Sequence, residues 1–349
     1  MAKERSAYWD NIKGILMLLT VFAHCLYQHQ TASLAIDRIT DFIYMFHMPA
    51  FVFISGYFGK SERAQSKESI LRLVFLYFIF NSAVGFLYGF TSLLKPMLSY
   101  WYLLALVAWR LTAKHLAKFR FTLPILFVLA IGAGFFETID NNFAVSRIIG
   151  FYPYYMLGYL LPTIKAEQLR QTKYSSRAVC GIALLICMLF AASFCGKVFQ
   201  YTDQALIMHF YTAPLDALGR ICLFGIAALG ILTLAVLSPN RKIPLLSAFG
   251  RNSLWIFLLH RPFTLILSSN MQNLQNAPKI LLSIGCTFVL CLLFGSDFLA
   301  KPMNDFAKNG AQFFSGNTTK KMSAAKIAVL GIAVCFVILM IRSAIALAD

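Results

Sequence analysis

Residues 9–24, WDNIKGILMLLTVFAH, begin with polar side chains and continue as an apolar run. Runs of this kind recur along all 349 residues, of which 59% are hydrophobic and only 13% charged. A soluble core of this size does not need so much apolar surface, so lipid is the natural solvent for the excess. Backbone polar groups cannot stay unpaired in hydrocarbon, and no segment alternates as barrel strands do. The sequence therefore predicts an all-α, polytopic transmembrane helical bundle.

Apolar runs of suitable length divide the chain into ten or eleven candidate spans. About 20 apolar residues cross a hydrocarbon core of about 30 Å, and a short or tilted helix needs somewhat fewer. The predicted spans are residues 11–28, 42–58, 73–92, 99–113, 121–136, 147–163, 178–195, 215–237, 252–268, 279–297 and 325–345. We expect a transmembrane domain over residues 1–297, a cytoplasmic linker over 298–324 and an additional C-terminal transmembrane helix within 325–349.

Basic residues predict the orientation of this bundle. With the N-terminus in the cytoplasm, most of the 31 Lys and Arg residues fall in six inner stretches. These stretches are residues 3–13, 60–72, 110–120, 165–177, 241–251 and 301–326. Every inner loop is then basic, as the positive-inside rule requires. The net charge of +17 is spread over separate loops that match the anionic inner leaflet of a plasma (inner) membrane. We therefore expect membrane lipids, and not nucleic acid, as partners.

Four polar residues of the first span lie on one face of the predicted helix. At about 100° per residue, Asp10, Lys13, Thr20 and His24 fall within about 80° of one another. A charged side chain inside the bilayer costs several kcal/mol, so this stripe is a functional candidate. The alternative is that Asp10 and Lys13 are interfacial residues at the helix start, with His24 a satisfied histidine of the bundle.

Two further spans contribute histidines. The second span carries His47 two turns before Ser55, and the ninth carries Ser253 seven residues before His260 on the same face. Histidine suits proton transfer because its reference pKa is close to neutral. Three histidines from three spans therefore indicate proton-transfer chemistry near an internal cavity. A buried histidine beside a proline break, such as His47 near Pro49, is also a common structural device.

Signatures of the usual soluble enzymes do not compete with this interpretation. The sequence has no Walker loop, no convincing dinucleotide fingerprint, no HExxH and no GxSxG. The eight cysteines lack CxxC or metal-finger spacing and are typical of small core residues. We therefore predict no metal cofactor.

Several motifs, in order along the chain, resemble acyltransferase family 3, the membrane-bound acetyltransferases that modify surface sugars. In that family a basic residue stands eleven positions before an intramembrane histidine, and Lys13 and His24 occupy these places, with Lys instead of the commoner Arg. The family's second, fourth, sixth and ninth span patterns resemble residues 46–58, 100–106, Arg147 with 151–159, and 250–260. The resemblance covers about residues 5–300 and is strongest to the fucose 4-O-acetylase-like branch.

The resemblance implies an O-acetyltransferase that moves an acyl group, usually acetyl, from cytosolic acetyl-CoA to a hydroxyl of a cell-surface or lipid-linked glycan at the outer face. Lys13 and Arg72 would hold the CoA at the inner mouth. His24 would act as the general base for the acceptor hydroxyl or would carry the acetyl group briefly. The catalytic candidates are His24, Asp10 and Lys13. Asp10 would orient the inner end of the stripe, although it lies about 21 Å from His24 and cannot hydrogen-bond it.

Further site residues are predicted on the same basis. Those that would position the acyl group or stabilise its oxyanion are His47, Ser55, Ser253 and His260. Arg147 and Arg220, near the outer ends of their spans, would contact the acceptor.

The rival function is a polytopic transporter or exporter of glycan intermediates or protons, for which intramembrane His and Arg are equally natural. Without the resemblance, the residues favour this class. Against it, the sequence has no two repeating halves and no paired spans broken by Gly or Pro. A catalytically inactive scaffold or sensor of the same fold is disfavoured by the presence of His24.

Overall fold

Helices make up the described part of the computed structural model, which covers residues 5–27, 33–88, 95–139, 142–199, 206–213 and 215–315. No strand occurs in these ranges, which confirms the predicted all-α fold. The longer helices are α1 (Ala7–Leu26), α2 (Leu34–Gly59), α4 (Lys67–Tyr88), α5 (Trp101–Leu116), α6 (Thr122–Gly132), α7 (Val145–Leu160), α9 (Tyr174–Phe199), α11 (Leu215–Leu237), α13 (Ser253–Asn270), α14 (Asn276–Phe294) and α15 (Asp297–Ser315). The shorter ones are α3 (Glu62–Gln65), α8 (Thr163–Gln171), α12 (Pro244–Arg251), η2 (Ala133–Phe135) and η3 (Asn142–Ala144). The predicted eleventh span, residues 325–345, lies outside the described residues.

Five of these helices are long and apolar enough to cross a membrane. They are α2, α4 as far as Gly85, α9 as far as Ser193, α11 and α14. Large apolar side chains of α9 and α14 are exposed, including Val179, Phe190, Leu281 and Val289. Such faces need lipid as their solvent, because a soluble protein rarely exposes apolar surface of this extent. The chain is therefore a polytopic membrane protein.

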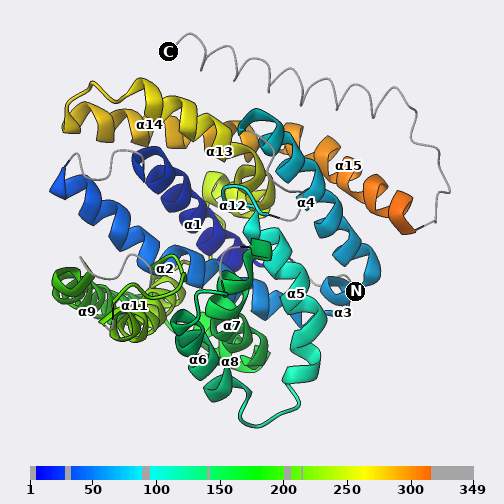
Figure 1. The fold of residues 1–349 in the computed structure, drawn as a ribbon, viewed down its shortest axis with the longest axis horizontal. Helices are drawn as coiled ribbons and strands as arrows, with labels where there is room; N and C mark the ends of the chain where they lie inside the picture. Colours follow the sequence, from blue (N-terminus) through cyan, green and yellow to red (C-terminus); the bar gives the residue numbers. More distant parts are fainter. Residues whose placement is uncertain are drawn as a thin grey trace.

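Helix α1 runs through the middle of the molecule (Figure 1) and contacts α2, α12, α13 and α14. Of its 20 residues, Asp10, Asn11, Thr20 and His24 are polar and buried. A polar stripe is tolerated at this position because the surrounding helices separate it from lipid. The stripe predicted from the sequence therefore faces protein.

Helices α2 and α7 cross at backbone contact distance through two glycines. A Cβ atom on Gly56 would overlap the carbonyl oxygen of Tyr155, and one on Gly158 would overlap the carbonyl oxygen of Phe53. Small residues at a crossing let two backbones approach closely, which is a main source of packing between transmembrane helices. The reciprocal pair fixes α7 against the half of α2 that follows Pro49.

We expect the substitution Gly158→Ala to lower the thermal unfolding midpoint of the protein purified in detergent. The added methyl meets backbone, which cannot rotate away, so the cost is about 1–3 kcal/mol. The matched control is Gly225→Ala in α11, where a Cβ meets nothing within 4 Å. Equal midpoints for the two variants would contradict the close crossing.

A second glycine pair locks α12 to the beginning of α1. A Cβ on Gly14 would overlap the carbonyl oxygen of Leu246, and one on Gly250 would overlap that of Asp10. Residue numbers rise along α1 as they fall along α12, so the two helices are antiparallel at this crossing. After Asn252 the chain reverses into α13, and the Asn252 side chain donates to the Gly295 carbonyl at 2.8 Å.

Helix ends that the predicted topology places on one side of the membrane meet in the structure. Lys60 at the end of α2 donates to the Leu161 carbonyl after α7 at 2.6 Å. Arg251 at the end of α12 pairs with Asp297 at the start of α15 at 2.8 Å. Each contact joins an inner stretch to the inner end of a predicted span, as expected if successive helices cross the membrane in alternate directions.

Residues 298–315 differ from the expected linker because they belong to helix α15, which packs along α4. In Figure 1 the two helices lie side by side at one edge of the molecule. Phe75 of α4 contacts Phe306 and Phe314 of α15, with ring centroids 5.0 and 6.1 Å apart. The segment is polar in mean composition but strongly amphipathic, so an apolar stripe stabilises the helix despite the low overall hydropathy.

Candidate active site

At the N-terminal end of α1, the Asp10 carboxylate lies between two cations. Arg5 Nε approaches one oxygen at 2.5 Å, and Lys13 Nζ approaches the other at 2.8 Å. Lys13 also lies 5.8 Å from the centre of the Phe58 ring. The structure therefore brings the predicted residues Asp10 and Lys13 into direct contact. It places Asp10 as the partner of Lys13, at the opposite end of α1 from His24.

Arg72, the second residue predicted to hold the donor, lies at the beginning of α4. Its Nη2 atom donates to Asn304 Oδ1 of α15 at 2.6 Å, while its Nε atom is buried without a hydrogen-bond partner. The sequence could not indicate this contact, because residue 304 falls in the stretch expected to be a linker. Helix α15 therefore holds the Arg72 guanidinium through Asn304.

His24 and His260 form a direct pair between α1 and α13. Nδ1 of His24 lies 2.7 Å from Nε2 of His260, and the two ring planes are within 5° of parallel. His260 Nδ1 in turn lies 2.8 Å from the carbonyl oxygen of Ile256. Two histidines predicted separately, 236 residues apart, are therefore one unit.

The hydrogen bonds of this pair fix its tautomers. A carbonyl oxygen only accepts, so His260 Nδ1 carries a proton. In neutral His260 the Nε2 atom then has a lone pair and accepts a hydrogen bond from His24 Nδ1–H. His24 Nε2 is left with an unshared lone pair, the form needed in a base or a nucleophile.

Tyr44 and His47 extend the cluster onto α2. The Tyr44 ring lies 6.0 Å from that of His24 and 4.9 Å from that of His47. His47 Nδ1 lies 2.8 Å from the Ile43 carbonyl oxygen, so its Nε2 atom also has a free lone pair. The structure thus brings the three predicted histidines together, and it adds Tyr44, which lies one helical turn before His47 and was missed from the sequence.

Among the three histidines, His24 has the most accessible side chain. It is 7% exposed, whereas His47 is 1% and His260 is 0% exposed. Tyr27, directly after α1, is 38% exposed and stacks on Tyr44 at 5.5 Å. Exposure therefore decreases from Tyr27 to His24 to His260, and His24 is the histidine that a substrate entering from this end would meet.

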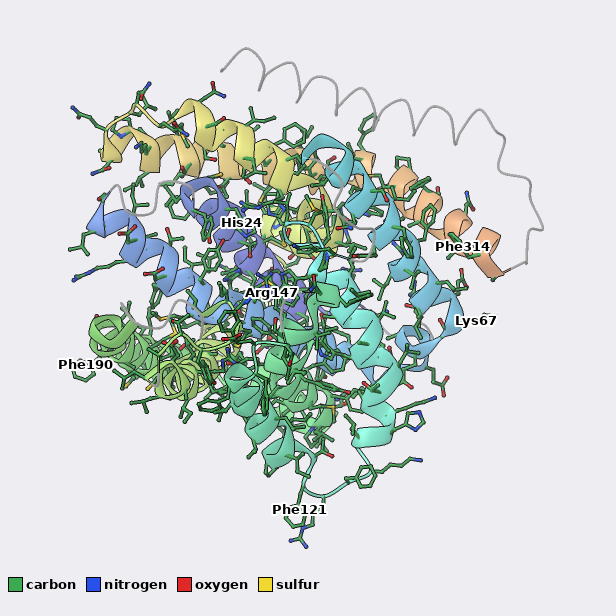
Figure 2. All side chains as sticks on the ribbon, in the orientation of Figure 1. His24, Lys67, Phe121, Arg147, Phe190 and Phe314 are labelled. Atoms are coloured by element: carbon green, nitrogen blue, oxygen red, sulfur yellow. The ribbon has the colours of Figure 1, made fainter. Side chains whose placement is uncertain are left out.

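Two arginines flank this cluster. Arg147, in the first turn of α7, lies 5.1 Å from the Trp101 ring centre, and Arg261 lies 5.9 Å from that of Tyr27. Both act electrostatically on Tyr44. Figure 2 labels His24 and Arg147, both over the central part of the molecule. Arg147 was predicted as an acceptor contact, whereas Arg261 was not, although a charge inside a span is itself a functional signal.

Three other predicted residues are placed elsewhere. Ser55 hydrogen-bonds the Tyr102 hydroxyl at 2.7 Å, two turns along α2 from His47. Ser253 begins α13, two turns before His260. Arg220 donates to the carbonyl oxygens of Ala130 at 2.9 Å and His209 at 2.5 Å, which joins α11 to α6 and to the segment at residue 209. No hydrogen bond between these three side chains and the histidine cluster occurs in the described part of the chain.

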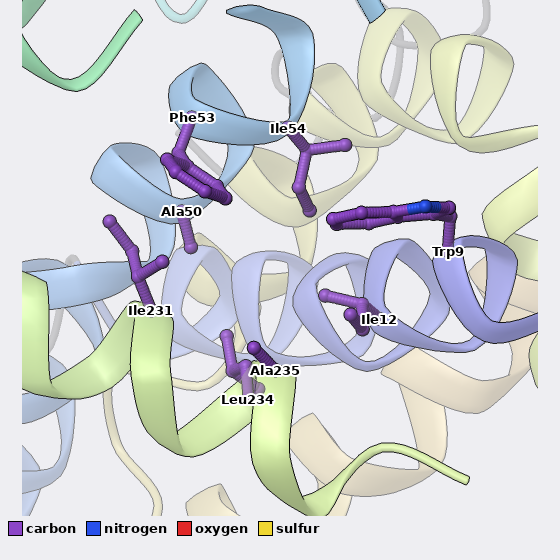
Figure 3. Close-up of a pocket in the computed structure, with 8 residues that line it drawn as sticks. All are labelled: Trp9, Ile12, Ala50, Phe53, Ile54, Ile231, Leu234 and Ala235. Carbon is purple, nitrogen blue, oxygen red and sulfur yellow. The ribbon is translucent and has the colours of Figure 1, made fainter. Parts of the chain in front are cut away.

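Two hollows lie away from the histidine cluster. A void of about 10 Å³ between α1, α2 and α11 (Figure 3) is lined by Trp9, Ile12, Ala50, Phe53, Ile54, Ile231, Leu234 and Ala235. It is apolar and no larger than a water molecule needs, so we expect it to be dry. A hollow of about 520 Å³ lies among residues 116–152, where exposed apolar side chains such as Ile125 and Val128 line it. Its lining suits a lipid chain better than a sugar.

The fold and the site together define a polytopic membrane protein with a buried histidine pair at one end of a polar central helix. Comparison of the chain with known families gives a match over residues 6–296 to acyltransferase family 3, described as an acyltransferase domain. The chain belongs to this family. The match confirms the resemblance drawn from the sequence motifs and the predicted enzyme class, an acyltransferase.

One curated relative is the nodulation protein NolL of Sinorhizobium fredii (strain NBRC 101917 / NGR234), which is 26% identical over 219 residues. The similarity covers 54% of this chain and 58% of the relative, so the chain spans little more than half the length of that protein. No solved structure matches the chain.

Proposed function

We propose that this protein is an O-acetyltransferase of the plasma (inner) membrane. It transfers an acyl group, acetyl in the simplest case, from cytosolic acyl-CoA to a hydroxyl of a cell-surface or lipid-linked glycan at the outer face. The single observation that carries the proposal is the His24–His260 pair, which leaves a bare Nε2 lone pair on the most accessible of three clustered histidines.

In the proposed reaction, His24 Nε2 accepts the proton of the acceptor hydroxyl as its oxygen attacks the thioester carbonyl. The new C–O bond forms, the C–S bond breaks, and the departing CoA sulfur receives that proton from His24. The same lone pair also serves the alternative route, in which Nε2 first takes the acyl group and then passes it to the hydroxyl.

His260 orients the base in this proposal. Its Nε2 atom accepts the hydrogen bond from His24 Nδ1–H, which holds the imidazole in one tautomer and stabilises the imidazolium formed during transfer. A histidine thus takes the place that a carboxylate occupies in many catalytic triads. Asp10 cannot take this role, because it pairs with Lys13 near the other end of α1.

Lys13 and Arg72 serve the donor in this proposal, since CoA phosphates suit cationic groups at the cytosolic end of the bundle. We expect Lys13→Gln to raise the KM for acetyl-CoA roughly tenfold, the effect of losing one charge-assisted contact, with little change in the KM for the acceptor. Steady-state kinetics on membranes, with donor and acceptor varied separately, measure the two constants. An unchanged donor KM would remove Lys13 from the donor site.

The function itself is tested with the full chain reconstituted in liposomes. Labelled acetyl-CoA is supplied on the side of the N-terminus and a glycan fraction from the cell envelope on the other. The proposal expects label on the glycan together with an equal amount of free CoA. Passage of unmodified glycan or protons without CoA release would instead identify the transporter that the intramembrane histidines and arginines also suit.

A further inference from the structure

Among the residues that the structure describes, the two arginines beside the histidine cluster have no anionic partner in an ion pair. The ion pairs of the described residues join Arg5 and Lys13 to Asp10, and Arg251 to Asp297. Arg147 and Arg261 take part in none of them. An unpaired cation in the membrane interior has a high free-energy cost, so two unpaired arginines favour binding of a negatively charged group.

Arg147 packs against an aromatic ring and has one nitrogen without a hydrogen-bond partner. Its guanidinium packs over the Trp101 ring, and its Nε atom is buried without a hydrogen-bond partner. The preceding residues Phe143 and Ala144 have φ angles of 53° and 59°, a left-handed conformation that side chains disfavour. This turn directly precedes the first helical turn of α7, which carries Arg147.

Arg261 follows His260 directly and, like Arg147, has one nitrogen without a hydrogen-bond partner. Its Nη1 atom is buried without a hydrogen-bond partner, and the guanidinium packs over Tyr27. The residue before it, His260, lies 2.7 Å from His24 through Nε2 and Nδ1. Asp41, on α2, also acts electrostatically on Tyr44. Arg147 and Arg261 thus each have one buried nitrogen without a hydrogen-bond partner in the described part of the chain.

We propose that Arg147 and Arg261 bind a carboxylate or phosphate group of the acceptor, so that the preferred acceptor is an acidic sugar rather than a neutral one. This inference rests on the proposed function and specifies its substrate class. Guanidinium groups match both anions through paired hydrogen bonds, and an anion here would satisfy the two orphan donors and the excess charge. The anion would then anchor the sugar while one of its hydroxyls meets His24 Nε2.

Three acceptors that differ only at carbon 6 test the proposal: methyl glucoside, methyl glucuronide and methyl glucoside 6-phosphate. With the wild-type protein we expect the KM of at least one charged acceptor to be about 10- to 100-fold below that of the neutral one. The better of the two charged acceptors shows whether the site takes a carboxylate or a phosphate. The substitutions Arg147→Gln and Arg261→Gln should each remove most of this preference and leave the acetyl-CoA KM unchanged. Arg120→Gln, at an exposed arginine between α5 and α6, is the control.

A binding measurement keeps this proposal separate from the proposed function. Because Arg147 packs on Trp101, a charged acceptor should change tryptophan fluorescence without any acyl donor, and Arg147→Gln should remove the change. If the charged sugars bind but no acyl transfer occurs, the anion site stands and the proposed function fails. If methyl glucoside is bound and acetylated as well as the charged sugars, the proposed function stands and the anion site is overturned. A rise in the donor KM alone in the glutamine variants also overturns it, since the arginines would then serve acyl-CoA.

Both variants should fold, because the arginines have no ion pair to lose. We expect their thermal midpoints to equal or exceed that of the wild type, as is common when an unpaired buried charge of a functional site is removed. A large fall in the midpoint would assign the arginines to packing and contradict the proposal.

Discussion

Replacing His24 with alanine is expected to lower kcat for acyl transfer by about 10²- to 10⁴-fold, the range for loss of a general acid–base group. The lone pair on Nε2 is the atom that accepts the hydroxyl proton, and His47 and His260 cannot substitute for it because they are almost fully buried. Acetyl-CoA binding at the Lys13 end should persist, so the loss should appear in kcat rather than in the donor KM. Labelled acetyl transfer by membranes containing equal amounts of protein measures both constants.

The matched control for His24 is His115→Gln, at an exposed histidine in the last turn of α5. It should leave kcat unchanged. If the His24→Ala protein is correctly inserted and transfers acetyl at the wild-type rate, His24 has no part in the chemistry. The histidine pair would then be a structural contact between α1 and α13.

His260→Leu is expected to give the second largest effect, a fall in kcat of about 10- to 150-fold. This range corresponds to the 1.5–3 kcal/mol typical of a hydrogen bond to a charged group, here the His24 imidazolium. Leucine fills the site but offers no acceptor to His24 Nδ1–H, so the His24 ring loses both its fixed tautomer and its stabilisation. The KM values for donor and acceptor should change little, because His260 is fully buried and meets neither substrate.

His260→Gln separates this role from simple packing. The glutamine side-chain oxygen can take the place of His260 Nε2 as an acceptor, so this variant should recover a substantial part of the activity that leucine loses. If the glutamine and leucine variants are equally impaired while both remain folded, His260 acts through packing and does not position His24.

The sequence was sufficient for features that depend on a single helix. The stripe from Asp10 to His24 follows from helical geometry alone, and the structure buries Asp10, Thr20 and His24 while Lys13 stays partly exposed. The pairing of His24 with His260 did not follow, because it depends on which of the helices lie beside α1, and no local signal specifies this. The contact between Arg72 and Asn304 could not be predicted either, because mean hydropathy does not detect the amphipathic helix α15 that carries Asn304.

Arg220 shows that the position of an arginine along a predicted span is not enough to predict what it contacts. Its place near the outer end of α11 predicted a contact with the acceptor, yet the structure engages its guanidinium with the carbonyls of Ala130 and His209. The Arg147 guanidinium instead packs over the Trp101 ring. Both arginines have the same sequence signal, and only the surrounding backbone carbonyls distinguish them.

The glycine contact between α1 and α12 has a consequence for the opposite end of the molecule. Gly14 and Gly250 fix α12 against α1, and Asn252 anchors the reversal into α13 to the Gly295 carbonyl. These contacts fix the rotation of α13 about its own axis at the Lys13 end, and because the helix is regular, this rotation also determines the direction in which His260 points. One extra residue between Gly250 and His260 would turn that imidazole by about 100° around the helix axis, away from His24. The spacing between these two residues therefore has to be conserved to the residue, although hydropathy and span length would tolerate an insertion.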